Sequence, residues 1–101
     1  MSDASSKIES ILENITFSPG VQGVVVCNTD GIPIRDSFQD VDRSRAIALA
    51  EAASELIRGA QQVCALSGSA VDCLRIRSTS QEILVKSNGT YLLVVIQEPS
   101  E

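Results

Sequence analysis

The chain has 101 residues, carries a net charge of −5 and is 44% hydrophobic but only 3% aromatic. This length predicts one domain over residues 1–101, with flexible ends at residues 1–5 and 98–101. Only eight residues are basic, which argues against nucleic acid or an anionic membrane as the main partner, because both require a positive field. The N-terminus lacks the basic and apolar regions of a signal peptide, and the longest apolar run, residues 91–96, is too short for membrane insertion.

Three cysteines, Cys27, Cys64 and Cys73, are odd in number and widely spaced. This usage predicts a reducing compartment and buried free thiols. The chain contains no histidine and no C-x-x-C pair, so we expect no metal site and no cofactor. A group of aspartates lacks the spacing of an EF-hand and is interpreted as solvated loop residues. The group consists of Asp30, Asp36, Asp40 and Asp42.

Residues 6–15 are predicted to form the first helix. Ser6-Lys7-Ile8-Glu9 matches a capping box, and the apolar residues recur at helical spacing. These apolar residues are Ile8, Ile11, Leu12 and Ile15. Ser18-Pro19-Gly20 ends the pattern. We expect this helix to pack on a sheet, and an additional contact with a partner is the alternative.

A β-hairpin is predicted next. Val24–Cys27 is a short, mostly β-branched run, typical of a strand covered on both faces. Asn28-Thr29-Asp30-Gly31 predicts the turn, because asparagine and aspartate bond their own backbone and glycine accepts a positive φ. Ile32–Arg35 returns as the second strand. Pro33 has no backbone N–H, so this strand should be an edge or carry a bulge.

Residues 43–62 form the longest predicted helix, with an N-cap at Asp40 or Asp42. One arc of this helix is apolar and is expected to face the sheet: Ala46, Leu49, Ala50, Ala53, Leu56, Ile57 and Ala60. The opposite side carries Glu51, Ser54, Glu55 and Arg58. A strip of small residues lies between them and consists of Ala48, Ala52 and Gly59. Helix propensity explains such a strip, and close packing against a second helix in a dimer is the other interpretation.

Residues 63–70 are predicted to be a connection that contains glycine and serine. Three strands follow, at residues 71–77, 81–86 and 90–97, and a strong hairpin signal joins the last two. The strand at residues 90–97 is apolar on both faces. This places it in the centre of the sheet beside Val24–Cys27.

The strand at residues 71–77 alternates, with Leu74 and Ile76 on one face and Arg75 and Arg77 on the other. Its charges mark it as an edge strand. With strands numbered in chain order, the predicted fold is a five-stranded antiparallel sheet of order 2-1-5-4-3. One helix is expected on each face, because strands that are apolar on both sides need cover on both. The predicted fold class is α/β, in the mixed α+β sense.

Several stretches, in order and over almost the whole chain, resemble the roadblock family of dynein light chains. They are Gly20–Gly23 with the valine run behind it, Asn28–Arg35, Leu74–Ser78, Glu82–Val85, and Tyr91–Gln97 with Glu98-Pro99. Each stretch is weak alone, whereas the ordered set is specific. The family has a profilin-like helix, two strands, helix, three strands arrangement, which agrees with the elements predicted from the residue patterns.

The resemblance implies a homodimer in which the third strands pair into a ten-stranded sheet and the second helices lie together. The implied interface consists of Ala48, Ala52, Gly59, Val71, Cys73, Leu74, Arg75, Ile76 and Arg77. Ile76→Pro is expected to break a backbone donor of the strand pairing. The implied role is a non-catalytic light chain that binds the dynein intermediate chain and supports complex assembly and cargo attachment. The implied location is the cytoplasm and microtubules, or a cilium or flagellum.

Two alternative functions differ from this role. An enzyme is disfavoured, because the sequence lacks histidine, a nucleophile elbow and a glycine-rich phosphate loop. Roadblock-like domains also serve as scaffolds or regulators of small GTPases, and in that role Arg35, Arg43 or Arg45 would lie near a nucleotide. Residues 63–73 are less acidic than is usual in the family, and Cys73 stands where phenylalanine is usual.

Overall fold

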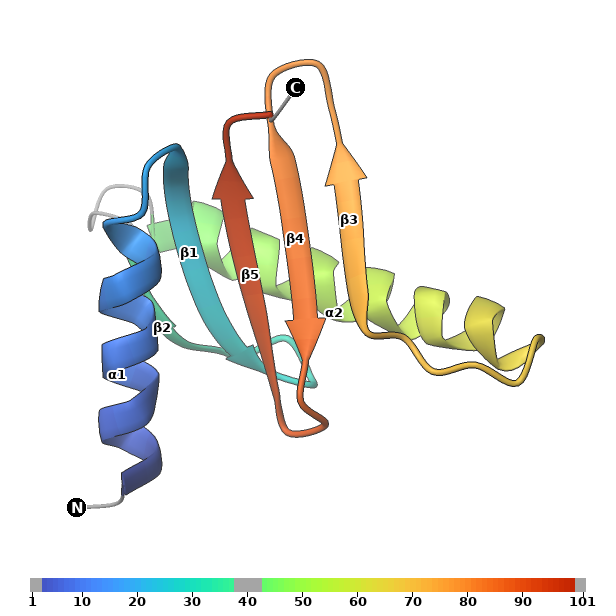
Figure 1. Ribbon diagram of the computed structural model, residues 1–101. Coiled ribbons are helices and arrows are strands. Elements are labelled where there is room, and N and C mark those ends of the chain that lie inside the picture. The colour runs from blue at the N-terminus through green and yellow to red at the C-terminus, as the bar shows by residue number, and fades with distance from the viewer. Residues whose placement is uncertain (1–2, 38–42, 100–101) are drawn as a thin grey trace.

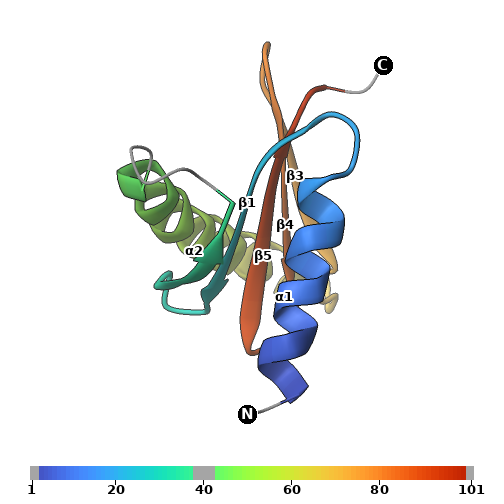
Figure 2. The same ribbon diagram turned by 90° about the vertical axis from the view of Figure 1, so that its left-hand side faces the viewer.

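The structure, a computed structural model, describes residues 3–37 and 43–99. The elements are α1 (Asp3–Thr16), β1 (Val21–Asn28), β2 (Pro33–Asp36), α2 (Arg43–Ala65), β3 (Cys73–Arg77), β4 (Glu82–Ser87) and β5 (Tyr91–Gln97). The strands form one antiparallel sheet in the order β2-β1-β5-β4-β3, which confirms the predicted topology (Figure 1). The helices lie on opposite faces, α1 over β1 and α2 across the other side (Figure 2).

The helices are longer than predicted. α1 begins at Asp3, three residues before the expected start, since aspartate and serine suit the first turn of a helix. α2 continues to Ala65 through residues that favour helix, and it ends in a turn where Gly68 has a φ of +73°. There the Ser69 N–H donates to the Cys64 carbonyl. The predicted N-cap at Asp40 or Asp42 lies outside the described residues, as do residues 1–2 and 100–101 of the expected flexible ends.

The hairpin between β1 and β2 forms as expected. The Asn28 side chain accepts hydrogen bonds from the N–H groups of Asp30 and Ile32, at 2.9 and 3.0 Å. Gly31 has a φ of +84°. β2 is an edge strand, and its pairing with β1 shifts between Val26 and Cys27, which confirms the irregularity expected from Pro33.

The hairpin turn packs against α2, a contact that the sequence patterns did not predict. The Ser54 hydroxyl donates to the Thr29 carbonyl at 2.7 Å and accepts a bond from Arg58 at 3.3 Å. Ser54 is 3% exposed, so its predicted place on the solvent side of the helix was wrong. The turn covers that side of α2, and the hydroxyl satisfies its hydrogen bond there.

The main core lies between α2 and the sheet. Its buried members are Val25, Cys27, Ala46, Ala50, Ala53, Ile57, Val85, Leu92 and Val94. The predicted apolar arc of α2 is therefore confirmed at Ala46, Ala50, Ala53 and Ile57, whereas Leu49 and Ala60 are half-buried. Leu56 is exposed, since it lies at the margin of the arc that faces the sheet.

The three cysteines differ in burial. Cys27 lies in the core, Cys64 is half-buried near the end of α2, and Cys73 is exposed on β3. The expectation that all three are buried was wrong, because β3 is an edge strand and Cys73 projects from the side that α2 does not cover. Burial raises the pKa of the Cys27 thiol from its ordinary value of 9.0 to about 11.

We expect the Cys27 thiol to resist alkylation in the folded chain at about pH 8, because the reactive thiolate is scarce and access is blocked. Mass spectrometry of iodoacetamide-treated protein checks this, with the denatured chain as the control. The neutral thiol is favoured by folding, so its contribution to stability is lost as pH rises from 9.0 towards 11. Rapid modification of Cys27 in the folded chain would contradict its place in the core.

Candidate interaction surface

One side of α2 presents an apolar strip that the chain itself leaves uncovered. Ala48, Ala52 and Gly59, the small residues predicted for an interface, are all exposed. The strip continues through larger exposed side chains: Leu56 at 46%, Val63 at 66% and Leu66 at 89% exposure. Leu56 was predicted to face the sheet, and Val63 and Leu66 were not predicted. Continuing the helical spacing beyond residue 62 would have found Val63.

β3 is an open edge strand. Its register with β4 decides which of its residues direct their N–H and C=O groups towards β4 and which direct them to the open side. The Ser78 N–H donates to the Gln81 carbonyl at 2.8 Å, so residues 78, 76 and 74 direct their backbone groups towards β4. Arg75 therefore directs its N–H and C=O away from β4, as Cys73 and Arg77 do. The expectation that Ile76 supplies a donor to a partner strand was wrong, since its N–H points inward.

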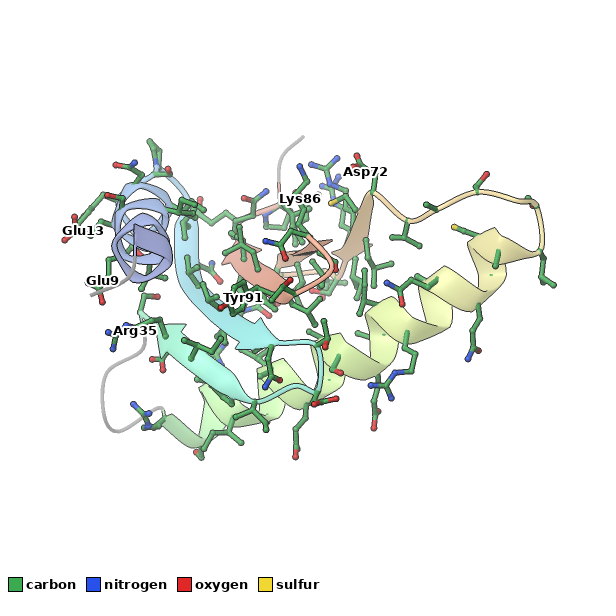
Figure 3. All side chains as sticks on the ribbon, turned by 90° about the horizontal axis from the view of Figure 1, so that it is seen from below. Glu9, Glu13, Arg35, Asp72, Lys86 and Tyr91 are labelled. Atoms are coloured by element: carbon green, nitrogen blue, oxygen red, sulfur yellow. The ribbon has the colours of Figure 1, made fainter. Side chains whose placement is uncertain are left out.

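The residues proposed from sequence around β3 separate into three groups. Val71 precedes the strand, which begins at Cys73, and packs half-buried against the core. Leu74 and Ile76 face α2, whereas Cys73, Arg75 and Arg77 face the opposite side. Figures 1 and 3 show the C-terminal half of α2 extending past the open edge of β3. This half of the helix carries Gly59 and Val63 of the strip.

Arg75 neutralises a buried carboxylate. Glu82 is 2% exposed, and its Oε1 lies 3.4 Å from the Arg75 Nη2. The Gln97 amide donates to the same oxygen at 2.7 Å. This carboxylate was not predicted from the sequence, where Glu82 is one more charged residue of a strand. The register places it opposite Arg77 and Gln97.

The arginines considered for a nucleotide site do not converge. The Arg35 Nε lies 2.8 Å from the Glu9 carboxylate and holds β2 to α1 (Figure 3). Arg43 lies 3.9 Å from Asp36 and begins α2, two residues before Arg45. Within residues 3–37 and 43–99, no group of three or more cysteine, aspartate or glutamate side chains could hold a metal ion. Neither described helix is long and apolar enough to cross a membrane.

The sequence pattern of the Roadblock/LC7 domain family matches residues 7–98. The chain belongs to the Roadblock/LC7 family. This confirms the resemblance to roadblock proteins and accounts for the strand order and the two covering helices.

Three solved structures share this roadblock fold. A Roadblock/LC7 domain from Streptomyces avermitilis is 18% identical, with a TM-score of 0.77 over 88% of this chain and 76% of that chain. The gliding protein MglB from Thermus thermophilus is 14% identical, with a TM-score of 0.82 over 97% and 76%. An MglB in a tetrameric arrangement is 15% identical, with a TM-score of 0.81 over 97% and 75%. At these identities the likeness shows the fold.

Proposed function

We propose that this roadblock domain acts as a homodimeric scaffold in the regulation of a small GTPase, without catalysis of its own. Two features of the chain carry the proposal together: an exposed apolar strip on α2 and an open β3 edge, past which the C-terminal half of α2 extends. A second copy of the chain would cover both features at once. The two α2 strips would pack together while the two β3 strands join their sheets.

The exposed surface supports a dimer. The chain has an accessible surface of 6669 Å², against roughly 5,500 Å² for a compact monomer of 10.7 kDa. A stable interface covers about 800 Å² on each partner, which is the scale of this excess. Small residues such as Ala48, Ala52 and Gly59 would let the two helix backbones approach closely.

Two observations favour a GTPase scaffold over a dynein light chain. The three structures named above are a bacterial roadblock domain and two MglB proteins, one of them a gliding protein, and none of these three is a dynein subunit. The role of GTPase scaffold is open to roadblock-like domains generally. Because Arg35, Arg43 and Arg45 do not converge on one site, we expect regulation through the dimer surface and not through an arginine that enters the nucleotide site.

Binding of a dynein intermediate chain is the second candidate. It rests on the resemblance of the hairpin at Asn28–Arg35 and of Leu74–Ser78 to the dynein light chains. A calorimetric titration with an intermediate-chain segment tests it, and the expected stoichiometry is one segment for two copies of this chain.

The GTPase role is tested by loading a panel of small GTPases with GTP and measuring complex formation and hydrolysis with and without this chain. Saturable binding with a changed hydrolysis rate supports the proposal. Binding to the intermediate-chain segment alone would replace it with the dynein role. A folded dimer that binds neither would leave the dimer intact and refute both partner assignments.

Ala52→Arg is expected to raise the dimer dissociation constant by about tenfold or more, because each interface would receive two buried, unpaired charges. Ala52 is exposed in the single chain, so stability of the monomer should change by less than about 0.5 kcal/mol. Sedimentation equilibrium measures the constant. Ser10→Arg, which adds the same charge at an exposed position of α1, on the other face of the sheet, is the control. Equal dimer dissociation constants for the two variants would show that the α2 strip faces solvent and is not part of the interface.

A further inference from the structure

The open edge of β3 carries like charges. Cys73, Arg75 and Arg77 direct their backbone groups to the open side, and their side chains project from the face of the sheet that α2 does not cover. Two of these three residues are arginines. When two copies of this strand pair, their arginines come together on one face, and like charges directly opposite each other in a sheet are destabilising.

The two-fold axis of the proposed dimer would pass beside Arg75. An antiparallel pairing of two copies bonds all three outward residues only when Arg75 lies opposite the Arg75 of the second copy, because Cys73 then lies opposite Arg77. Directly opposite residues have Cβ atoms about 5 Å apart. Two guanidinium groups would therefore meet at the centre of the pairing unless each is held away from the axis.

Glu82 holds Arg75 from the other side, within the same chain. The register places Arg77 opposite Glu82 and Arg75 opposite Leu84, so Glu82 is a diagonal neighbour of Arg75 on the same face. Its Oε1 lies 3.4 Å from the Arg75 Nη2 and accepts a hydrogen bond from the Gln97 amide at 2.7 Å. The Glu82 residue is 2% exposed, whereas the Arg75 side chain is 61% exposed. The carboxylate is thus the fixed member of the pair, and it draws the guanidinium towards β4.

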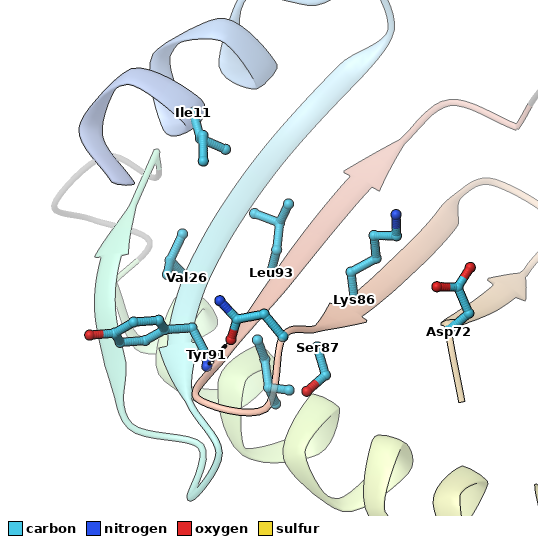
Figure 4. Close-up of a pocket in the computed structure, with 9 residues that line it drawn as sticks. Ile11, Val26, Asp72, Lys86, Ser87, Tyr91 and Leu93 are labelled. Atoms are coloured by element: carbon cyan, nitrogen blue, oxygen red, sulfur yellow. Dashed lines mark hydrogen bonds between the residues drawn. The ribbon is translucent and has the colours of Figure 1, made fainter. Parts of the chain in front are cut away.

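Glu82 is the only acidic side chain that β3 and β4, both fully described, direct to this face. The others on the face are Cys73, Arg75, Arg77, Leu84 and Lys86. Lys86 projects to the side of the sheet where α1 lies, and Asp72 precedes β3 at the same end of the strand as Lys86 (Figure 4). The register places Lys86 opposite Cys73, at the other end of β4 from Glu82. Without Glu82, the two strands would present three cations and no acid here.

We propose that Glu82 is a positioning residue of the homodimer: it draws the Arg75 guanidinium away from the two-fold axis and so allows two copies of β3 to pair. The Arg75 N–H stays available to the second copy, because it points to the open edge while the side chain leans towards β4. Since Glu82 is buried and bonded to Gln97, the guanidinium is placed before the second copy arrives. This inference rests on the β3 pairing of the proposed function and not on the partner that the dimer serves.

Glu82→Gln removes the charge and keeps an oxygen that accepts the hydrogen bond from Gln97. It leaves no buried charge unpaired, since Arg75 is largely exposed, so the variant should stay folded. At about 50 mM salt we expect its dimer dissociation constant to be about fivefold to tenfold higher than that of Glu13→Gln, which removes the same charge from an exposed position of α1. At about 1 M salt, where the Debye length is about 3 Å, the difference should shrink to about twofold. Sedimentation equilibrium measures the constants, and circular dichroism checks the fold.

A double variant separates positioning from stabilisation of the monomer. Arg75→Gln combined with Glu82→Gln leaves no like charges at the axis, so its dimer dissociation constant should return to within about threefold of that of the unmodified chain. If Glu82 only stabilised the fold, the double variant would dimerise no better than Glu82→Gln, because both lack the ion pair. The proposal is overturned by that result, by a Glu82→Gln dimer as tight as the control, or by a weakening that salt does not relieve. An unmodified chain that stays monomeric would instead refute the β3 pairing, and with it the proposed homodimer.

Discussion

Gly31→Ala is expected to lower the free energy of unfolding by about 3 kcal/mol, a large effect for one added methyl group. Gly31 has a φ of +84°, where an L-residue costs about 1–2 kcal/mol. A Cβ at this position would also lie 3.1 Å from the Ala50 carbonyl oxygen, the Glu51 Cα and the Ser54 Cβ. The first two atoms belong to the backbone of α2, so relief requires the turn and the helix to move apart. That movement would weaken the hydrogen bond from Ser54 to the turn.

Gly89→Ala is the matched control. Gly89 also has a positive φ, of +93°, in a hairpin turn, but an added Cβ would meet no atom within 4 Å. Gly89→Ala should therefore lower the free energy of unfolding only by the backbone strain, about 1 kcal/mol. Urea denaturation of both variants at one protein concentration isolates the contribution of the contact with α2. Equal destabilisation by the two substitutions would show that the turn does not pack against the helix in solution.

The elements that the sequence predicted well are those specified by local chemistry. The turn at Asn28–Gly31 needs only its own side chains and a glycine, and the apolar run at Tyr91–Gln97 needs cover on both faces. Once these two features are set, hairpin connections leave few strand orders. The alternation in β3 likewise identified an edge strand, because charged side chains on one face are stable only where that face meets water.

The features that were missed depend on contacts between distant segments. Ser54 lies among charged residues on a helical wheel, and only the docking of a turn 25 residues away makes its burial favourable. The same is true of Glu82, whose burial depends on Arg75 and Gln97 from the two neighbouring strands. The glycine and serine after residue 65 hid the last turn of α2, and with it the end of the apolar strip.

Two adjacent residues of β3, Arg75 and Ile76, direct their backbone N–H groups to opposite sides of the strand, so proline is expected to act differently at each. Arg75→Pro is expected to weaken the homodimer about tenfold to a hundredfold. The Arg75 N–H points to the open edge, so its loss removes a donor from each strand of the proposed pairing, and two-fold symmetry doubles the effect. Each backbone hydrogen bond contributes about 0.5–1.5 kcal/mol net. Proline is tolerated on an edge strand when its missing N–H faces outward, so the backbone change itself should leave the monomer folded. Loss of the Arg75 side chain does lower monomer stability, because Glu82 is left buried without its cation.

Two control variants separate the loss of the outward N–H from the other consequences of Arg75→Pro. Arg75→Ala removes the ion pair with Glu82 but keeps the N–H, so the difference between the alanine and proline variants reports the backbone donor alone. Ile76→Pro removes a donor that points to β4 and should instead destabilise the monomer, because it breaks the ladder within the chain. Analytical ultracentrifugation gives the dissociation constants, and circular dichroism gives the fold. If Arg75→Pro dimerises as tightly as Arg75→Ala, the two sheets do not join through β3, and the α2 strip alone would have to hold the dimer.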